Sequence, residues 1–158
     1  MNRRFKVLIF LLLIIGQIIL QRYVQQLKIH LDLLYLILVY ISVMSGFYKT
    51  LLTASLIGLV TDYFCSANLM GVFGFSRVIA GFILNEVSHR IDLKNNIFVF
   101  LLIAVSLSFS NAIANLFLYF IQGFSFNLDM LLYQPVLTGL LGLIIVTSSK
   151  ARMYLDVY

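Results

Sequence analysis

Residues 33–61 read LLYLILVYISVMSGFYKTLLTASLIGLVT, and this stretch decides how the chain divides into helices. Its 29 residues carry one charged side chain, that of Lys49. Because a membrane-spanning helix needs about 20 mostly apolar residues, the stretch is long for one span and short for two. The only turn-like residues in it, Ser45 and Gly46, lie shortly before Lys49. We therefore expect two helices joined by a tight hairpin at this point.

The rest of the chain has the same apolar character. Of 158 residues, 62% are hydrophobic and 11% are charged, whereas soluble domains average about 45–50% apolar and about 25% charged. Six spans of about 20 residues leave no room for a soluble catalytic or DNA-binding domain. The sequence predicts an all-α integral membrane protein: one domain over residues 1–158, folded as a compact bundle of six transmembrane helices. The expected spans are residues 5–21, 31–48, 50–65, 69–86, 96–121 and 131–148.

The distribution of Lys and Arg predicts the orientation of this bundle. Eight of them fall on the side of the N-terminus, namely Arg3, Arg4, Lys6, Lys49, Arg90, Lys94, Lys150 and Arg152. Only Arg22 and Lys28 fall in the opposite loops. Such asymmetry sets the orientation of a membrane protein, with the basic side cytoplasmic. We therefore expect both termini on the cytoplasmic side of a bacterial cytoplasmic membrane. The net charge of +5 follows from these helix ends, and we expect no nucleic-acid partner because no basic surface patch with aromatic residues accompanies it.

The N-terminal segment combines a charged start, Arg3 to Lys6, with an apolar run from Val7 to Leu20. A signal peptide has the same beginning but also a cleavage site of small residues. Bulky residues occupy that place here, so we expect a retained first span. Cys65 is the only cysteine, which excludes an internal disulfide.

Arg77 is the most unusual residue because it falls well inside an apolar span. Buried charges of this kind usually face the interior of the bundle or a watery cavity. We expect Arg77 to form an ion pair with Asp62, which ends the preceding span. Two readings stay open: Arg77 has only a structural role, by pairing or by reaching the interface, or it contacts a ligand or partner in an outward-facing cavity.

Two asparagines, Asn111 and Asn115, lie one turn apart in the fifth expected span. Amide side chains within a lipid-spanning helix must find partners inside the protein. Hydrogen bonds between helices are one explanation, and a stripe that binds a solute is the other.

Residue patterns for catalysis, metal binding or cofactor binding are missing from the sequence. His30 and His89 fall on opposite sides of the expected bundle, so they cannot share a metal ion. No nucleophile elbow, phosphate-binding loop or paired-carboxylate motif occurs. We expect a protein that is not an enzyme and uses no cofactor.

One part of the chain carries a more specific sequence motif than the apolar spans do. Residues 54–64 read ASLIGLVTDYF, and residues 69–71 read LMG. The stretch Gly58-Leu59-x-x-Asp62, a small polar loop and a Leu-x-Gly group opening the next helix resembles the MreD family of rod shape-determining proteins. The resemblance also covers chain length, number of spans and the basic C-terminal end, and its specific part is about forty residues, Asp32 to Gly71.

This resemblance implies a fold and a role. The MreD family is similar in fold to the six-helix substrate-binding components of energy-coupling-factor transporters. The resemblance also implies that this chain is a non-enzymatic scaffold of the bacterial cell-elongation complex in the inner membrane, with MreC, MreB and the RodA–PBP2 peptidoglycan synthase as partners. We expect the transmembrane helix of MreC to dock on a face of small residues, with Gly58, Gly71, Gly74 and Gly81 as the contacts.

The alternative function is a solute-binding membrane component of a transporter that captures a vitamin near Arg77 and Asn111. Such components typically carry an Ala-x-x-x-Ala face on the first span. Here residues 7–20 are almost entirely bulky and aliphatic, with Gly16 as the one small residue. This difference favours the scaffold.

Overall fold

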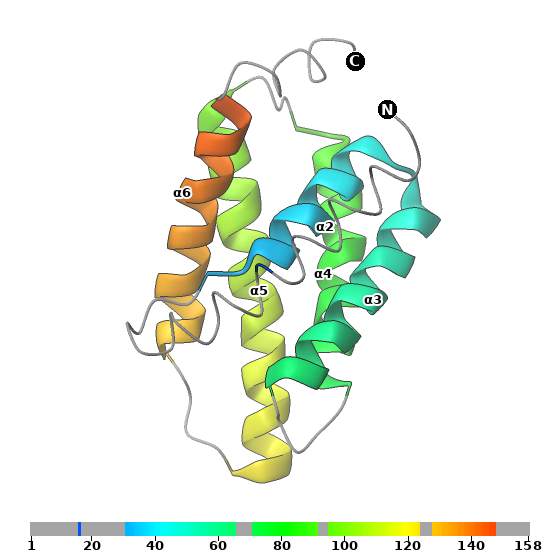
Figure 1. Ribbon diagram of the computed structural model, residues 1–158, viewed down its shortest axis with the longest axis vertical. Coiled ribbons are helices and arrows are strands. Elements are labelled where there is room, and N and C mark those ends of the chain that lie inside the picture. Colours follow the sequence, from blue (N-terminus) through cyan, green and yellow to red (C-terminus); the bar gives the residue numbers. More distant parts are fainter. Residues whose placement is uncertain (1–15, 17–30, 66–70, 92–94, 124–127, 148–158) are drawn as a thin grey trace.

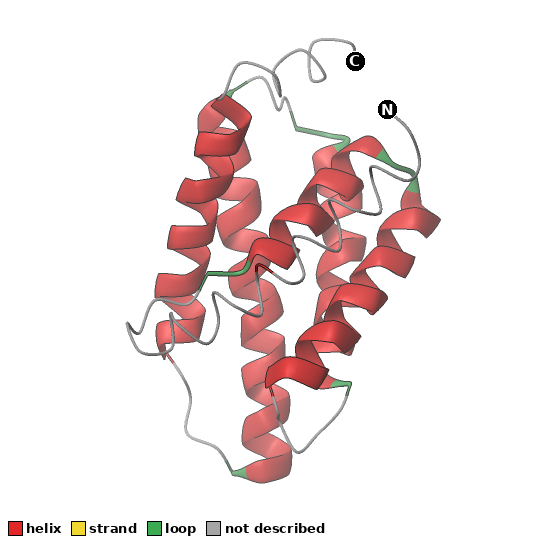
Figure 2. Cartoon of the chain, viewed as in Figure 1, coloured by secondary structure: helices red, strands yellow, loops and turns green. Residues whose placement is uncertain are grey.

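The computed structural model describes residue 16 and residues 31–65, 71–91, 95–123 and 128–147, and every regular element in these residues is a helix (Figures 1 and 2). The expected first span, residues 5–21, lies outside the described residues apart from Gly16. The elements are α2 (Leu33–Met44), α3 (Phe47–Cys65), α4 (Val72–Ser88), α5 (Asn96–Gln122), the π-helical turn η1 (Asp129–Tyr133) and α6 (Gln134–Thr147).

The helices form an elongated bundle around α4 and α5 (Figure 1). α3 packs most extensively on α4, and α6 packs on α5 along the opposite side. α2 crosses the bundle obliquely and contacts α3, α4, α5 and α6. Helices that follow each other in the chain are antiparallel neighbours (Figure 1), as short connections require.

Local sequence explains where the helices begin and end. Asp32 caps α2, since its Oδ1 accepts the backbone N–H of Tyr35 at 3.0 Å. Asn95 caps α5 in the same way by accepting from Ile97 N–H. α2 ends at Met44, the backbone of the following Ser45 is extended, and α3 begins at Phe47. The structure therefore divides residues 33–61 at Ser45–Gly46, where the sequence predicts the hairpin.

The helices differ greatly in length. With 27 residues, α5 is about 40 Å long, whereas α2 with 12 residues is about 18 Å long. Within the described chain, one helix is long and apolar enough to cross a membrane by itself, Asn96–Ile121 in α5. Leu33–Met44 and Asp129–Ile145 are apolar but shorter.

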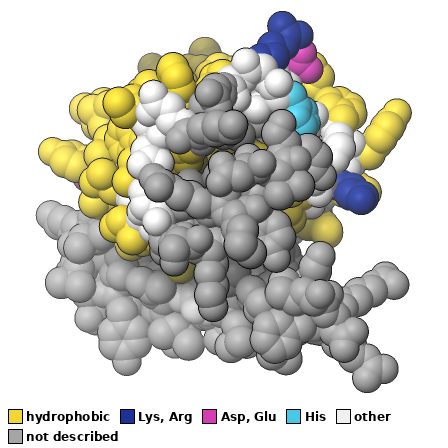
Figure 3. Space-filling model, turned by 90° about the horizontal axis from the view of Figure 1, so that it is seen from above, with side chains coloured by type: hydrophobic (Ala, Val, Ile, Leu, Met, Phe, Trp, Pro, Cys, Tyr) yellow, Lys and Arg dark blue, Asp and Glu magenta, His cyan; other side chains and the backbone are white. Residues whose placement is uncertain are grey.

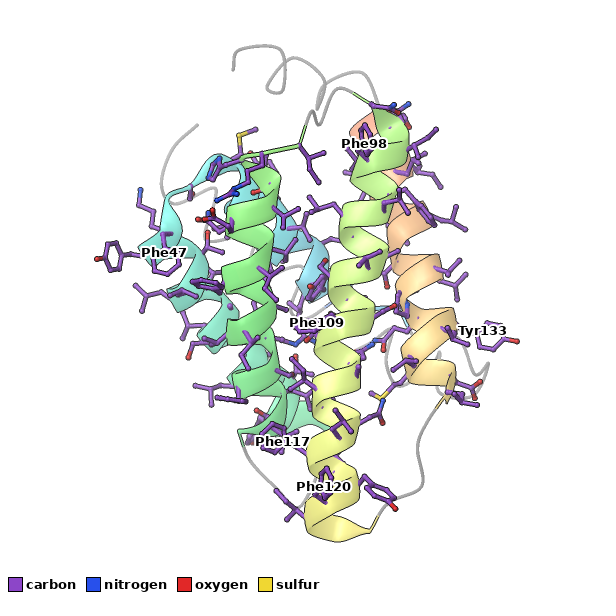
Figure 4. All side chains as sticks on the ribbon, turned by 180° about the vertical axis from the view of Figure 1, so that it is seen from behind. Phe47, Phe98, Phe109, Phe117, Phe120 and Tyr133 are labelled. Atoms are coloured by element: carbon purple, nitrogen blue, oxygen red, sulfur yellow. The ribbon has the colours of Figure 1, made fainter. Side chains whose placement is uncertain are left out.

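Apolar side chains cover the outside of the bundle as well as its core. The core is built from residues of α2, α3, α4 and α5, among them Leu38, Ile57, Leu84 and Leu107. Large apolar side chains such as Leu56 (59% exposed) and Phe120 (80% exposed) point outward from the helices, as Figure 4 shows for Phe120 and Tyr133. Seen from one end, hydrophobic side chains dominate the described surface and the charged ones lie at its rim (Figure 3).

Polar side chains, in contrast, gather inside. The buried polar and charged residues are Asp32, Ser42, Thr50, Asp62, Ser76, Arg77, Asn85, Ser88, Ser106, Ser110, Asn111, Asn115, Gln134 and Thr138. Charged and amide side chains usually prefer the surface, and here Asp32, Asp62 and Arg77 are buried while Lys49, Glu86, Arg90 and Asp129 are exposed. These buried groups form the candidate site.

Candidate functional site

Asp62 lies at the junction of α3 and α4, where it caps the start of α4. Its Oδ1 accepts the backbone N–H of Phe73 and its Oδ2 accepts that of Gly74, each at 2.9 Å. The residue at the N-cap position of α4 is Gly71, which has no side chain to do this. A carboxylate at a helix N-terminus satisfies unpaired N–H groups and interacts favourably with the helix dipole. Asp62 therefore supplies the cap from the neighbouring helix.

The glycines of the sequence motif make this junction possible. A Cβ atom on Gly58 would lie 2.3 Å from the Cα atom of Gly74, so the two backbones approach as closely as glycine allows. Gly71 has a φ of 104°, a left-handed conformation that glycine adopts readily. Further along α4, a Cβ on Gly81 would lie 3.0 Å from the Cβ of Ala54. Gly58, Gly74 and Gly81 thus face the chain's own helices, whereas no atom lies within 4 Å of a Cβ on Gly71. Docking of MreC on these glycines stays a prediction.

The expected ion pair between Asp62 and Arg77 is not formed, and this prediction was wrong. Arg77 donates from Nη2 to Oδ2 of Asp32 instead. Both side chains are buried, with Arg77 3% and Asp32 3% exposed. The reason is the short α2, whose N-terminus lies within the bundle instead of at its end, so that Asp32 reaches the interior position of Arg77.

Asp32 connects three helices. Its Oδ1 caps α2, its Oδ2 accepts from Arg77 of α4, and its backbone N–H donates to Thr138 Oγ1 of α6 at 3.2 Å. The guanidinium of Arg77 also lies over the ring of Tyr35, with Cζ 5.7 Å from the ring centroid, within the range of a cation–π interaction. Sequence reasoning missed Asp32, and the signal that identifies it is an Asp at the N-cap position of an apolar helix.

Asn111 holds the start of α6. Pro135 has no backbone N–H, so it cannot bond the carbonyl of Leu131 in an α-helix or that of Met130 in a π-helix. Side chains of α5 bond these two carbonyls: Ser108 Oγ donates to Leu131 O at 3.1 Å and Asn111 Nδ2 to Met130 O at 2.7 Å. Asn111 also donates to Gln134 Oε1 at 3.0 Å. The helix–helix reading of Asn111 therefore has direct geometric support.

Asn85 holds the turn between α2 and α3. Its Nδ2 lies 3.2 Å from Ser42 O, 3.3 Å from Ser45 O and 3.4 Å from Thr50 Oγ1. One buried amide thus lies against a carbonyl of the last turn of α2, where helix ends leave carbonyls unpaired, the carbonyl of Ser45 and a hydroxyl in the first turn of α3.

Asn115 lies one turn beyond Asn111 on α5 and is 6% exposed. Its Nδ2 and the Nη1 of Arg77 are buried without a hydrogen-bond partner among the described residues. Asn115 therefore differs from Asn111, whose donor group is fully used.

Together these side chains mainly join the chain's own helices. In the part of the chain that the structure describes, no three of His, Cys, Asp and Glu lie together as metal ligands. His89 is exposed beside Asn85, and His30 is outside the described residues. Comparison of the chain with protein-family models, with curated proteins and with solved structures finds no match in any of the three.

Proposed function

We propose that this chain is a multi-pass protein of a bacterial inner membrane, with six spans and both termini cytoplasmic. The observation that carries this proposal is the burial pattern: three charged residues, Asp32, Asp62 and Arg77, and several amide side chains lie inside, and large apolar side chains cover the outside. Soluble monomers rarely expose contiguous apolar patches larger than a few hundred Å². In a bilayer the same surface contacts acyl chains at no cost.

The short α2 fits this setting because its buried end has its polar groups satisfied. A helix can begin inside a membrane only where its free N–H groups are bonded within the protein. Asp32 provides this for α2, since its side chain accepts from Tyr35 N–H and its own N–H donates to Thr138. Residues 129–147 gain a comparable stabilisation from Asn111 and Ser108.

Within the membrane, we propose a non-enzymatic scaffold of the cell-elongation complex, of the MreD type, that binds MreC and acts with MreB and the RodA–PBP2 synthase. Two things support this proposal: the resemblance to the MreD family and the junction of α3 and α4 at Asp62. Gly58, Asp62 and Gly71, the residues that carry the resemblance, act together in joining α3 to α4. Because Gly58, Gly74 and Gly81 are covered by the chain's own helices, MreC would dock on an outward apolar face.

The solute-binding alternative has less support. Arg77, the charge that would attract an anionic vitamin, is neutralised by Asp32. Asn111 is fully engaged with Met130 and Gln134. No specific observation favours vitamin capture over the scaffold.

Co-purification tests the scaffold proposal. The full chain is co-expressed with affinity-tagged MreC encoded in the same genome and extracted in mild detergent. We expect co-elution in a fixed ratio. The matched control is MreC with its transmembrane helix replaced by an unrelated apolar helix of equal length, which should recover none of the chain. Equal recovery by both forms of MreC, or by neither, contradicts the proposal.

A further inference from the structure

Four buried side-chain atoms have no hydrogen-bond partner among the described residues: Tyr35 Oη, Ser42 Oγ, Arg77 Nη1 and Asn115 Nδ2. Two of them, Nη1 of Arg77 and Nδ2 of Asn115, can only donate. Both residues are more than nine-tenths buried. Buried polar groups almost always have a partner, from the protein or from a bound molecule. Two such groups on neighbouring helices therefore call for a common explanation.

The helices α4 and α5 are antiparallel and pack on each other (Figure 1). The rings of Phe75 and Phe117 mark a common level of the two helices because their centroids are 5.4 Å apart on the outer side of the pair. Arg77 follows Phe75 by two residues, and Asn115 precedes Phe117 by two. Two residues correspond to about 200° around a helix, so both side chains point from their helices toward the interior.

The charges at this level define what can bind there. Asp32 already balances the charge of Arg77 through Nη2, so an anion gains little. Arg77 Nη1 and Asn115 Nδ2 are both N–H donors, because a guanidinium has no acceptor and Nδ2 of an amide only donates. The unpartnered hydroxyls of Tyr35 and Ser42 can donate or accept. The complementary group is a neutral oxygen with two lone pairs.

We propose that Arg77 and Asn115 jointly bind a neutral hydrogen-bond acceptor, an oxygen atom of a trapped water molecule or of a small uncharged molecule, between α4 and α5. Buried waters typically make about three hydrogen bonds to groups that are otherwise unpaired. This site is additional to the scaffold role and does not depend on which partner the chain binds.

Water-edited solid-state NMR on the full chain in lipid bilayers tests the proposal. The experiment measures magnetisation transfer from water to side-chain N–H groups. With bound water, the Nη signals of Arg77 and the Nδ2 signal of Asn115 receive strong transfer. Asn111 is the matched control, since its Nδ2 donates to Met130 O and Gln134 Oε1 and should receive several-fold less.

A second arm identifies an organic occupant. Mass spectrometry of an extract from the purified protein would find an uncharged small molecule in about stoichiometric amount, with little water transfer at either residue. In Asn115→Leu, whichever signature the wild type shows should be lost, and the Arg77 resonances should shift. Absence of both water transfer and a co-purifying molecule in the folded wild type overturns the proposal.

Discussion

Gly58 and Gly74 bring the backbones of α3 and α4 into direct contact: a Cβ on Gly58 would lie 2.3 Å from the Cα of Gly74. One turn beyond Gly58 on α3, Asp62 caps α4 through the N–H groups of Phe73 and Gly74. Close approach and capping depend on each other, because a wider helix separation moves the carboxylate away from both N–H groups.

Gly58→Ala should therefore be strongly destabilising. The new methyl group meets backbone atoms, which cannot rotate away, and such overpacking typically costs about 1–3 kcal/mol. Loss of the Asp62 cap adds about 1 kcal/mol. Together the overpacking and the lost cap outweigh the gain of about 1 kcal/mol in helix propensity. The measurement is the thermal unfolding midpoint in detergent. Gly46→Ala is the control, since no atom lies within 4 Å of its Cβ position; equal midpoints for both variants would contradict the account.

The Asp32–Arg77 pair should show strong energetic coupling. Asp32→Asn keeps an oxygen to cap Tyr35 N–H but leaves Arg77 as an unbalanced buried charge, which costs about 3–5 kcal/mol. Adding Arg77→Met should recover much of this loss. A double-mutant cycle on unfolding free energies measures the coupling, and strictly additive losses would exclude the pair.

Asp62 and Arg77 should behave independently in the same kind of cycle. Exchanging their charges should not restore stability, because Asp62 bonds backbone N–H groups and not Arg77. Rescue by the exchanged double variant, measured as recovery of the unfolding midpoint, would revive the ion pair that the structure does not contain.

The Ser108 side chain should contribute to stability because Pro135 has no backbone N–H to bond the carbonyl of Leu131. Ser108→Ala leaves the Leu131 carbonyl without its side-chain donor, at a cost of about 1–3 kcal/mol for a buried group. In Pro135→Ala the backbone N–H of residue 135 becomes available to the same carbonyl, so Ser108→Ala should then cost clearly less. Unfolding midpoints of the single and double variants test this, and an equal cost of Ser108→Ala in both backgrounds would refute the proposed role of Pro135.

The helical class and the places of the described helices were predictable because they depend on local patterns. Hydropathy locates the apolar runs, and Ser45–Gly46 supplies the break within residues 33–61. The inward position of Asn111 was also predictable, since an amide in an apolar helix must find a partner in the protein.

The partner of Arg77 was not predictable from the same patterns. Hydropathy suggested a span over residues 31–48, which places Asp32 at a membrane surface, whereas α2 comprises Leu33–Met44 and begins inside the bundle. The depth of a helix end depends on tertiary packing. The same limit applies to the glycines, whose spacing predicts close helix contacts but not which helix makes them.

The most direct test of the membrane assignment introduces a charge on the outer surface. Leu56, on the exposed face of α3, becomes lysine, and the fraction of full chain in alkali-washed membranes is measured against the wild type. A lysine facing lipid near the middle of a span costs about 2.5–3.5 kcal/mol, so Leu56→Lys should greatly reduce the folded, membrane-retained protein. Tyr48 lies near the N-terminal end of α3. Tyr48→Lys should be tolerated because the lysine side chain can reach the interface. A wild-type chain that leaves the membrane on alkaline washing, or a Leu56→Lys variant as abundant and stable as the wild type, would contradict the account.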